Sequence, residues 1–146
     1  NAKQIFLSGH SAGGYLDLMI GLENKWLAKH GINTNQIAGL IPLSPQVISH
    51  YTIRDENGIS KYQPLIDTYA PLYHIKKETP PIILITGDRA MELLGRYEEN
   101  AYFFRMMKVI ENPLVKLFEL QGFDHGEMVK PGIPLLMKEL GAILKK

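Results

Sequence analysis

The chain has 146 residues, of which 45% are hydrophobic and 21% charged, and its formal net charge is +1 at pH 7. This size and composition fit one domain with its own core, and the near-neutral charge gives no support for binding to nucleic acid or to a membrane surface. The sequence contains no cysteine, which excludes disulfides, and no apolar run approaches the length of a membrane span.

Apolar runs and helical periodicity predict alternating strands and helices. The expected elements are, in chain order, a strand over 4–8, a helix over 12–30, a strand over 37–43, an irregular segment over 44–80, a strand over 82–86, a helix over 93–111, a strand over 115–120 and a helix over 131–145. Because strands alternate with helices, parallel crossovers are favoured. The predicted fold class is α/β, with about four parallel strands flanked by helices in a single domain over residues 1–146.

Helical spacing also predicts which side chains of the last two helices enter the core. In the helix over 93–111, the residues expected to be buried are Tyr97, Ala101, Phe104 and Met107. In the helix over 131–145, they are Ile133, Leu136, Met137, Leu140 and Leu144.

The junction between the first strand and the first helix, residues 9–14, reads Gly-His-Ser-Ala-Gly-Gly. A serine between glycines on a sharp strand-to-helix turn is typical of a nucleophile elbow, in which side chains at Gly9 and Gly13 are expected to collide with the strand and the helix. Such a turn presents the Ser11 hydroxyl at the carboxyl edge of the sheet and the Ala12 N–H toward an oxyanion. A glycine-rich turn that only packs closely or binds a phosphate is the alternative at this point.

Two later strand ends carry residues that would complete the chemistry of such a serine. Asp88 follows the strand over 82–86, and His125 lies in the loop after the strand over 115–120. Parallel strands carry these loops to one edge of the sheet. Ser11, Asp88 and His125 are therefore expected to converge there, in the chain order nucleophile, acid, base.

Other histidines and one neighbouring carboxylate are weaker candidates for the base and the acid. His30, His50 and His74 are expected at surface or packing positions. Asp124 adjoins His125, but adjacent side chains diverge in an extended loop, so Asp124 is expected to form local hydrogen bonds instead.

The order of these elements, with Gly-Asp at residues 87–88 and Asp-His-Gly at residues 124–126, resembles the C-terminal half of an enzyme of the α/β-hydrolase superfamily. The stretches Ala-Pro-Leu-Tyr-His-Ile at 70–75 and Thr-Gly-Asp-Arg at 86–89 are similar to the esterase/lipase group, which includes bacterial carboxylesterases, carbohydrate acyl esterases and kynurenine formamidase-like hydrolases. The resemblance implies a carboxylesterase-like or lipase-like serine hydrolase that cleaves a small acyl ester through an acyl-enzyme on Ser11.

The resemblance also implies a role for each residue of the site. The implied roles are nucleophile for Ser11, base for His125, orienting acid for Asp88, oxyanion-hole donor for Ala12 and substrate binding for His10 and Ser44. No metal or cofactor is implied. A serine peptidase or amidase would use the same triad, and a catalytically incompetent fragment would act only as an assembly or binding unit. Both alternatives stay open.

The segment over 44–80 is expected to form a small cap over Ser11 and to set the substrate preference. Its tyrosines would either stack on a sugar or aryl acyl group or anchor the loop. They are Tyr51, Tyr62, Tyr69 and Tyr73.

The beginning of the chain departs from the family pattern. Asn1-Ala2-Lys3 directly precede the elbow strand, whereas the family has further strands and a glycine-rich oxyanion loop there, and the sequence has no His-Gly-Gly-Gly segment. We therefore expect a truncated domain whose strand over 4–8 has an unpaired edge. A second copy of the chain or a missing N-terminal half is expected to cover that edge.

Overall fold

Four parallel strands form one sheet at the centre of the molecule. The computed structural model describes residues 4–145, so the expected chain opening Asn1-Ala2-Lys3 and the last residue, Lys146, lie outside the described residues. The strands follow the order β1 (Phe6–Leu7), β2 (Gly39–Leu40), β3 (Ile82–Gly87) and β4 (Val115–Leu120), and each neighbouring pair is parallel. The α/β fold class and the four parallel strands are thereby confirmed.

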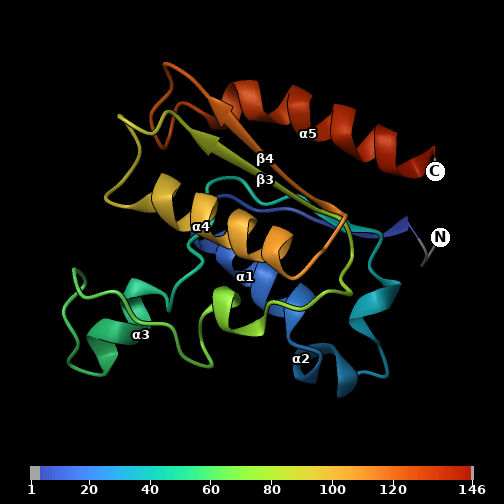
Figure 1. The fold of residues 1–146 in the computed structure, drawn as a ribbon, viewed down its shortest axis with the longest axis horizontal. Helices are drawn as coiled ribbons and strands as arrows, with labels where there is room; N and C mark the ends of the chain where they lie inside the picture. Colours follow the sequence, from blue (N-terminus) through green and yellow to red (C-terminus); the bar gives the residue numbers. More distant parts are fainter. Residues whose placement is uncertain (1–3, 146) are drawn as a thin grey trace.

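Helices cover both faces of this sheet. They are α1 (Ala12–Leu22), α2 (Lys25–Ala28), α3 (Tyr51–Glu56), α4 (Arg96–Val109) and α5 (Val129–Leu144), with short 3-10 helices η2 (Thr34–Gln36) and η3 (Pro71–His74). Figure 1 shows α5 on one side of the sheet and α1 and α4 on the other. None of the helices in residues 4–145 combines the length and the apolar character needed to cross a membrane.

The side chains of β3 divide between two cores, because successive residues of a strand point to opposite faces of the sheet. Ile82 and Leu84 belong to the cluster with residues of α1 and α4, whereas Ile83 and Ile85 pack with residues of α5. All six residues of β3 are buried. The strand is thus fixed from both sides, and its carboxyl end at Gly87 is a rigid support for the loop that follows.

The first two strands are shorter than expected but continue as single contacts toward the elbow. Pro42 has no N–H to donate, which interrupts the regular ladder of β2. Beyond it, Leu43 N–H donates to Gly9 O at 2.9 Å, and Leu43 forms isolated bridges with His10 and with Ile85. The register of the sheet therefore extends to the residue before Ser11.

Two expected elements differ from the structure along the chain. The helix expected over 12–30 is divided, because Glu23 has an extended backbone (φ −98°, ψ 105°) and α2 begins after it. The segment over 44–80, expected to be irregular, contains α3 and η3.

The buried face of α5 is rotated by about one residue from the face expected. A Cβ atom on Gly132 would lie 2.5 Å from Leu43 Cδ2, so the helix approaches the sheet most closely at this glycine. Leu136 and Leu140 pack against the core as expected, but the expectation was wrong for three residues that are exposed: Ile133 (52%), Met137 (58%) and Leu144 (46%).

Candidate active site

Ser11 stands at a strained turn between β1 and α1. Its backbone has φ 56° and ψ −113°, and it is the N-cap residue of α1. A non-glycine residue at positive φ costs on the order of 1–3 kcal/mol and persists only where its surroundings hold it. Here Ser11 N–H donates to Leu43 O at 2.9 Å, which ties the turn to the extension of β2. This is the backbone geometry that the elbow motif predicts.

The glycines around Ser11 are not all needed for the same reason. A Cβ atom on Gly9 would lie 2.6 Å from the carbonyl carbon of Gly13, and one on Gly14 would lie 2.9 Å from Gly9 O. A Cβ atom on Gly13 would meet nothing within 4 Å, so the expected collision at Gly13 is wrong. The tight contact is made by the backbone of Gly13, and Gly9 and Gly14 are the positions that exclude a side chain.

The Ala12 N–H is a free donor at the start of α1. Gly13 N–H, the next donor, is occupied by His10 O at 2.9 Å, whereas Ala12 N–H makes no hydrogen bond to another residue within 4–145. Ala12 is also exposed. An N–H at a helix start carries the partial positive charge of the helix dipole, so Ala12 can stabilise an anion next to Ser11.

His125 is paired with Glu92, which comes from the loop after β3. His125 Nδ1 lies 2.8 Å from Glu92 Oε2, and Gly87 N–H donates to Glu92 Oε1 at 3.0 Å. The Glu92 side chain is only 1% exposed and that of His125 is 16% exposed. The carboxylate is therefore enclosed, while the imidazole reaches the surface.

Ser44 contacts both members of the Glu92–His125 pair. It is fully buried (0% exposed), and its hydroxyl donates to Glu92 Oε1 at 2.5 Å and lies 3.1 Å from His125 Nδ1. Its backbone has φ 44°, a second strained position in the site. Ser44 was expected to bind substrate, and that role stays a prediction; in this structure its hydroxyl is buried and engaged by Glu92 and His125. The structure places Ser44 as a support for Glu92 and His125.

Glu92 is held in its ionised form. Burial alone would raise its pKa, but the hydrogen bonds from His125, Ser44 and Gly87 outweigh burial and lower the pKa of Glu92 to about 2. A carboxylate only accepts hydrogen bonds, so His125 Nδ1 carries the proton of the shared bond. In this tautomer His125 Nε2 is left as a proton acceptor.

Asp88, the expected acid, has a different position. Its Oδ1 accepts from Ala90 N–H and its Oδ2 from Gly122 N–H, both at 2.8 Å. These bonds connect the loop after β3 with the loop after β4. The hydrogen bond that Asp88 was expected to make with His125 is thus made by Glu92.

The turn after β3 explains why sequence reasoning missed Glu92. Glu92 N–H donates to Asp88 O at 2.8 Å, so the chain curls back and returns the Glu92 side chain to the end of β3. Gly95 has φ 70° and delays the start of α4 to Arg96. The sequence did contain a second carboxylate, Glu92, in the same loop. That loop lies between Gly87 and Gly95 and is longer than expected, because α4 begins at Arg96.

His10 holds the loop of His125 against the elbow. His10 Nε2 donates to His125 O at 2.8 Å, and the two ring centroids are 4.6 Å apart. Burial lowers the pKa of His10, which favours the neutral ring. His10 was expected to bind substrate, and that role stays a prediction; in this structure its Nε2 is engaged by this loop. Ser11 and His125 are both described, and no hydrogen bond joins the Ser11 hydroxyl to the His125 ring.

The weaker candidates occupy the positions expected of them. Asp124 Oδ1 accepts from Gly126 N–H at 2.9 Å and from Glu127 N–H at 2.8 Å, which confirms its local hydrogen bonding. His50 Nδ1 accepts from Thr52 N–H at the start of α3, and His74 Nε2 lies 2.8 Å from Thr68 O.

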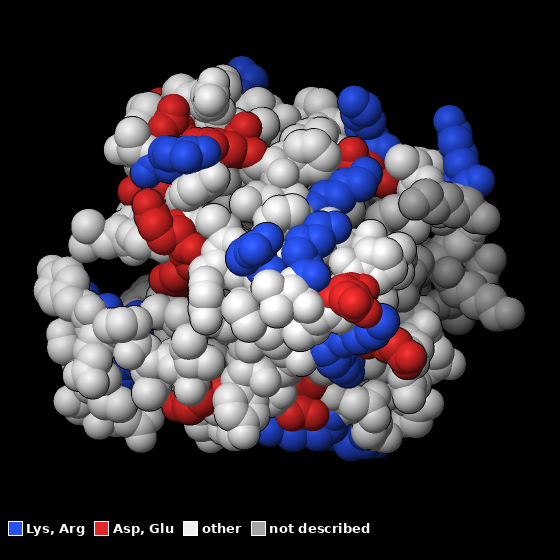
Figure 2. Space-filling model, viewed as in Figure 1, with Lys and Arg blue, Asp and Glu red and all other residues white. Residues whose placement is uncertain are grey.

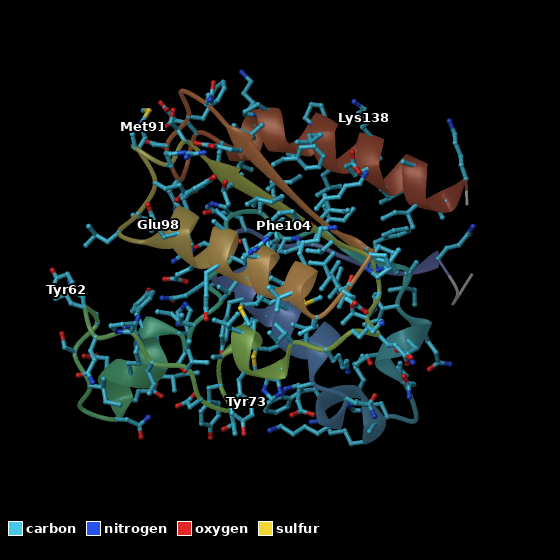
Figure 3. The ribbon with its side chains drawn as sticks, viewed as in Figure 1. Tyr62, Tyr73, Met91, Glu98, Phe104 and Lys138 are labelled. Carbon is cyan, nitrogen blue, oxygen red and sulfur yellow. The ribbon has the colours of Figure 1, made fainter. Side chains whose placement is uncertain are left out.

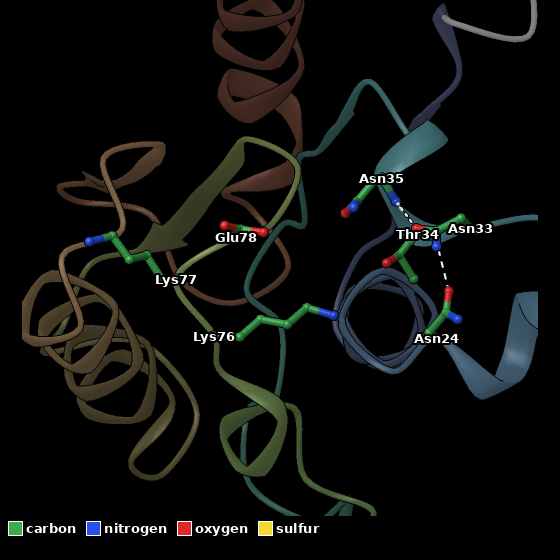
Figure 4. Close-up of a pocket in the computed structure, with 7 residues that line it drawn as sticks. All are labelled: Asn24, Asn33, Thr34, Asn35, Lys76, Lys77 and Glu78. Atoms are coloured by element: carbon green, nitrogen blue, oxygen red, sulfur yellow. Dashed lines mark hydrogen bonds between the residues drawn. The ribbon is translucent and has the colours of Figure 1, made fainter.

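A pocket elsewhere has no part in this group. It has a volume of about 470 Å³ and is formed by segments that precede β2 and β3 (Figure 4). Ser11 and His125 follow the carboxyl ends of β1 and β4. Its lining residues are Asn24, Asn33, Thr34, Asn35, Lys76, Lys77 and Glu78. Nowhere in residues 4–145 do three or more His, Asp or Glu side chains gather in a way that could hold a metal ion.

Comparison with solved structures finds the same arrangement of strands and helices in esterases. Esterase 2 from the Planctomycetes species Thermogutta terrifontis, solved with bound propionate, has a TM-score of 0.72 and 22% identity over 95% of this chain and 56% of that enzyme. A truncated carbohydrate esterase from gut microbiota has a TM-score of 0.71 and 13% identity over 95% of this chain and 59% of its own.

This chain has the α/β-hydrolase fold. It spans a little over half the length of the esterases that it matches. No family model matches the sequence, and no curated protein does. The likeness to the esterases therefore concerns the fold, and the chemistry has to be argued from this chain's own residues.

Proposed function

We propose that this α/β-hydrolase domain belongs to a serine carboxylesterase in which Ser11 is the nucleophile, His125 the base and Glu92 the residue that orients His125. The single observation that carries the proposal is the buried Glu92–His125 pair, hydrogen-bonded at 2.8 Å, beside a serine held at φ 56°. A nucleophile, a base and an orienting carboxylate are the parts that acyl transfer requires.

Each group has a defined step in ester hydrolysis. Ser11 Oγ attacks the ester carbonyl while His125 Nε2 accepts its proton, and Ala12 N–H donates to the oxyanion that forms. His125 then gives the proton to the leaving alcohol as the C–O bond breaks. Water, deprotonated by His125, attacks the acyl carbonyl, and His125 returns that proton to Ser11 Oγ as the acid leaves. Glu92 stabilises the imidazolium that exists during both halves of the reaction.

The solved neighbours support this choice of chemistry. Structures of Thermogutta esterase 2 include propionate-bound and butyrate-bound forms and forms phosphorylated by paraoxon or phosphonylated by sarin. Such phosphorus reagents modify activated nucleophiles. For this chain we infer a small-molecule ester with a short acyl group as the substrate.

The 44–80 segment is part of the proposal as a cap on the substrate side. Tyr15, one turn after the elbow in α1, donates its hydroxyl to Tyr69 O at 2.7 Å, so the segment is fastened to the helix that begins at Ser11. We also propose that the outer edge of β1 is covered in the functional protein, by a second copy or by an N-terminal half. Light scattering of the purified chain tests whether a second copy covers this edge.

The test of the proposed function is the reactivity of Ser11. A fluorophosphonate probe is expected to label Ser11, and Ser11→Ala should abolish both labelling and hydrolysis of p-nitrophenyl butyrate. Ser60→Ala, at an exposed serine of the 44–80 segment, is the matched control and should leave both unchanged. Labelling elsewhere would contradict the assignment of Ser11. A chain that cleaves amino-acyl amides but no esters would make it an amidase.

A further inference from the structure

A second cavity lies beside the segment that follows Glu92. It has a volume of about 660 Å³ and is lined by residues between 46 and 64 and between 93 and 99. Figure 2 shows a hollow in this part of the surface, at the left of the view, with Lys or Arg atoms at its lower margin and Asp or Glu atoms at its upper right margin. Arg54 of α3 and Arg96 of α4 both line it.

Both guanidinium groups are buried, and neither has a carboxylate partner. Arg54 is 3% exposed and Arg96 is 5% exposed. Arg54 Nη1 donates to Lys61 O and Gln63 O, and Arg96 Nη1 donates to Ser44 O, but the Nε atoms of both residues have no hydrogen-bond partner. In the described part of the chain, neither arginine forms an ion pair. Buried charges are normally paired, so two unpaired cations on one cavity need an explanation.

The lining supplies one carboxylate for three cations. Lys61 adds a third cation, and Glu99 is the one carboxylate of the cavity wall. Glu99 Oε2 accepts from Val47 N–H at 3.1 Å. Burial raises the pKa of Glu99, while the charges of Arg96 and Arg54 act in the opposite direction. Burial likewise lowers the pKa of Arg96. An anion that entered this cavity would favour the charged form of Arg96 and compensate its desolvation.

The position of Arg96 in its helix points the same way. It is the first residue of α4, where a cation opposes the helix dipole, and the N-cap Gly95 has no side chain to cap the helix. A residue that is unfavourable for the stability of its own helix often serves a function elsewhere in the structure. Arg96 is buried there and lines the cavity.

We propose that this cavity binds an organic carboxylate, with the carboxylate group against Arg54 and Arg96 and an apolar body against Leu93, Leu94 and Tyr62. The planar guanidinium group is suited to a carboxylate, which it can bind through two parallel hydrogen bonds. The lining also contains these apolar and aromatic side chains, so the cavity suits an acid with a hydrocarbon portion rather than an inorganic ion.

The carboxylate belongs either to the ester substrate itself or to a separate small acid. The cavity adjoins the catalytic group, because Arg96 Nη1 donates at 2.7 Å to the carbonyl of Ser44, whose hydroxyl contacts Glu92 and His125. Binding of the anion does not rest on the proposed esterase activity. Its assignment to the substrate does.

The test compares an acid with its neutral isostere. Isothermal titration of the chain with 4-phenylbutyrate and with 4-phenylbutyramide measures the two affinities at one salt concentration. The acid is expected to bind at least about tenfold more tightly than the amide, as for about one charge-assisted hydrogen bond gained. Equal affinity for the two compounds would overturn the proposal.

Three variants locate the bound acid. Arg96→Lys keeps the charge but loses the planar fork and should weaken binding of the acid by about tenfold. Arg96 also holds Ser44 O, so a second variant is needed that leaves this bond intact. Lys61 is exposed, and among the described residues its ammonium group donates to no backbone carbonyl. Lys61→Gln should weaken binding of the acid severalfold. Lys138→Gln, on α5 and distant from the loop of Tyr62 (Figure 3), is the matched loss of a surface lysine and should change nothing. Unchanged binding in both Arg96→Lys and Lys61→Gln would overturn the proposal.

Kinetics distinguish the two sources of the carboxylate. If 4-phenylbutyrate inhibits hydrolysis of neutral p-nitrophenyl butyrate competitively, and the p-nitrophenyl hemiester of glutaric acid has the higher kcat/KM, the cavity holds the substrate's own carboxylate. Inhibition or activation that is not competitive indicates a separate acid. A chain that binds the acid but hydrolyses no ester supports this inference while it contradicts the proposed function.

Discussion

Replacing Glu92 by glutamine tests which of the two carboxylates after β3, Asp88 or Glu92, orients His125. The Glu92 carboxylate receives four hydrogen bonds, from Ser44 Oγ at 2.5 Å and Gly87 N–H at 3.0 Å on Oε1, and from His125 Nδ1 at 2.8 Å and Leu93 N–H at 3.1 Å on Oε2. Glutamine has one oxygen, and we expect it to stay with Ser44 and Gly87, the donors at Oε1. Its NH₂ group would then face His125 Nδ1, and the ring would have to move its proton to Nε2.

A proton on Nε2 prevents His125 from accepting the proton of Ser11. From the cost of the wrong tautomer in serine enzymes, we expect Glu92→Gln to lower kcat by about 10⁴-fold, or about 5 kcal/mol in the barrier. The rate of Ser11 labelling by a fluorophosphonate should fall in parallel. Hydrolysis of p-nitrophenyl butyrate and the labelling rate are measured at the same pH, and a fall of less than tenfold in both would refute the reasoning.

Asp88→Asn is the matched control because it makes the same chemical change in the same loop. Asparagine has one oxygen for the two backbone donors, Ala90 N–H and Gly122 N–H, so we expect a loss of about 1 kcal/mol in the free energy of unfolding. The value of kcat should stay within about tenfold of the original. The reverse result, with Asp88→Asn inactive and Glu92→Gln active, would return the orienting role to Asp88.

Two further predictions concern stability and are measured by urea unfolding. Gly9→Ala places a Cβ atom 2.6 Å from the Gly13 backbone and should destabilise the chain by about 1–3 kcal/mol, whereas Gly13→Ala meets nothing and should stabilise α1 by up to about 1 kcal/mol; equal effects would contradict the account of the elbow. Burial raises the pKa of Asp17 to about 6, so folding favours its protonated form and ionisation is costly above that pH. Asp17→Asn should therefore stabilise the chain by about 1–3 kcal/mol at pH 7.5 and lose that gain below about pH 4, and a gain independent of pH would exclude this cause.

The parts of the fold that were predicted correctly rest on continuous apolar runs. β4 has the predicted bounds, Val115–Leu120, and β3 extends one residue beyond its prediction, because each run is long enough to span a buried sheet. β2 is shorter than its run, and it ends at Leu40, close to Pro42, which has no N–H for the ladder. A hydrophobic run predicts burial, but it does not show which backbone N–H donors are missing.

The buried side of α4 shows a second limit of hydrophobic periodicity. Met107 is buried as predicted, but the other buried positions of the helix include Arg96 and Asn100, whose polar side chains the pattern counts as exposed. Asn100 Nδ2 donates to Pro45 O and to Arg96 O, both at 2.8 Å, and Arg96 donates to Ser44 O. Polar residues that enter the core to bind backbone carbonyls have no apolar signal.

The site shows the corresponding limit for catalytic groups. The elbow was predictable because its sequence spacing is local, and the structure bears out the turn at Ser11. Glu92 was not, because it meets His125 only after the chain turns back between β3 and α4, and Ser44 reaches the same pair from the segment after β2. Sequence order indicates which sheet edge a carboxylate reaches but not which of two carboxylates in one loop turns back toward the histidine.

Arg96 has a consequence for control of the proposed esterase. Its Nη1 holds the carbonyl of Ser44, and Arg96 also lines the second cavity. Any ligand that displaces this guanidinium would alter how firmly Ser44 is held, and thermodynamic linkage requires the effect to be mutual. A transition-state analogue on Ser11 should then change the affinity of the cavity for its anion by the same factor with which the anion changes binding of the analogue.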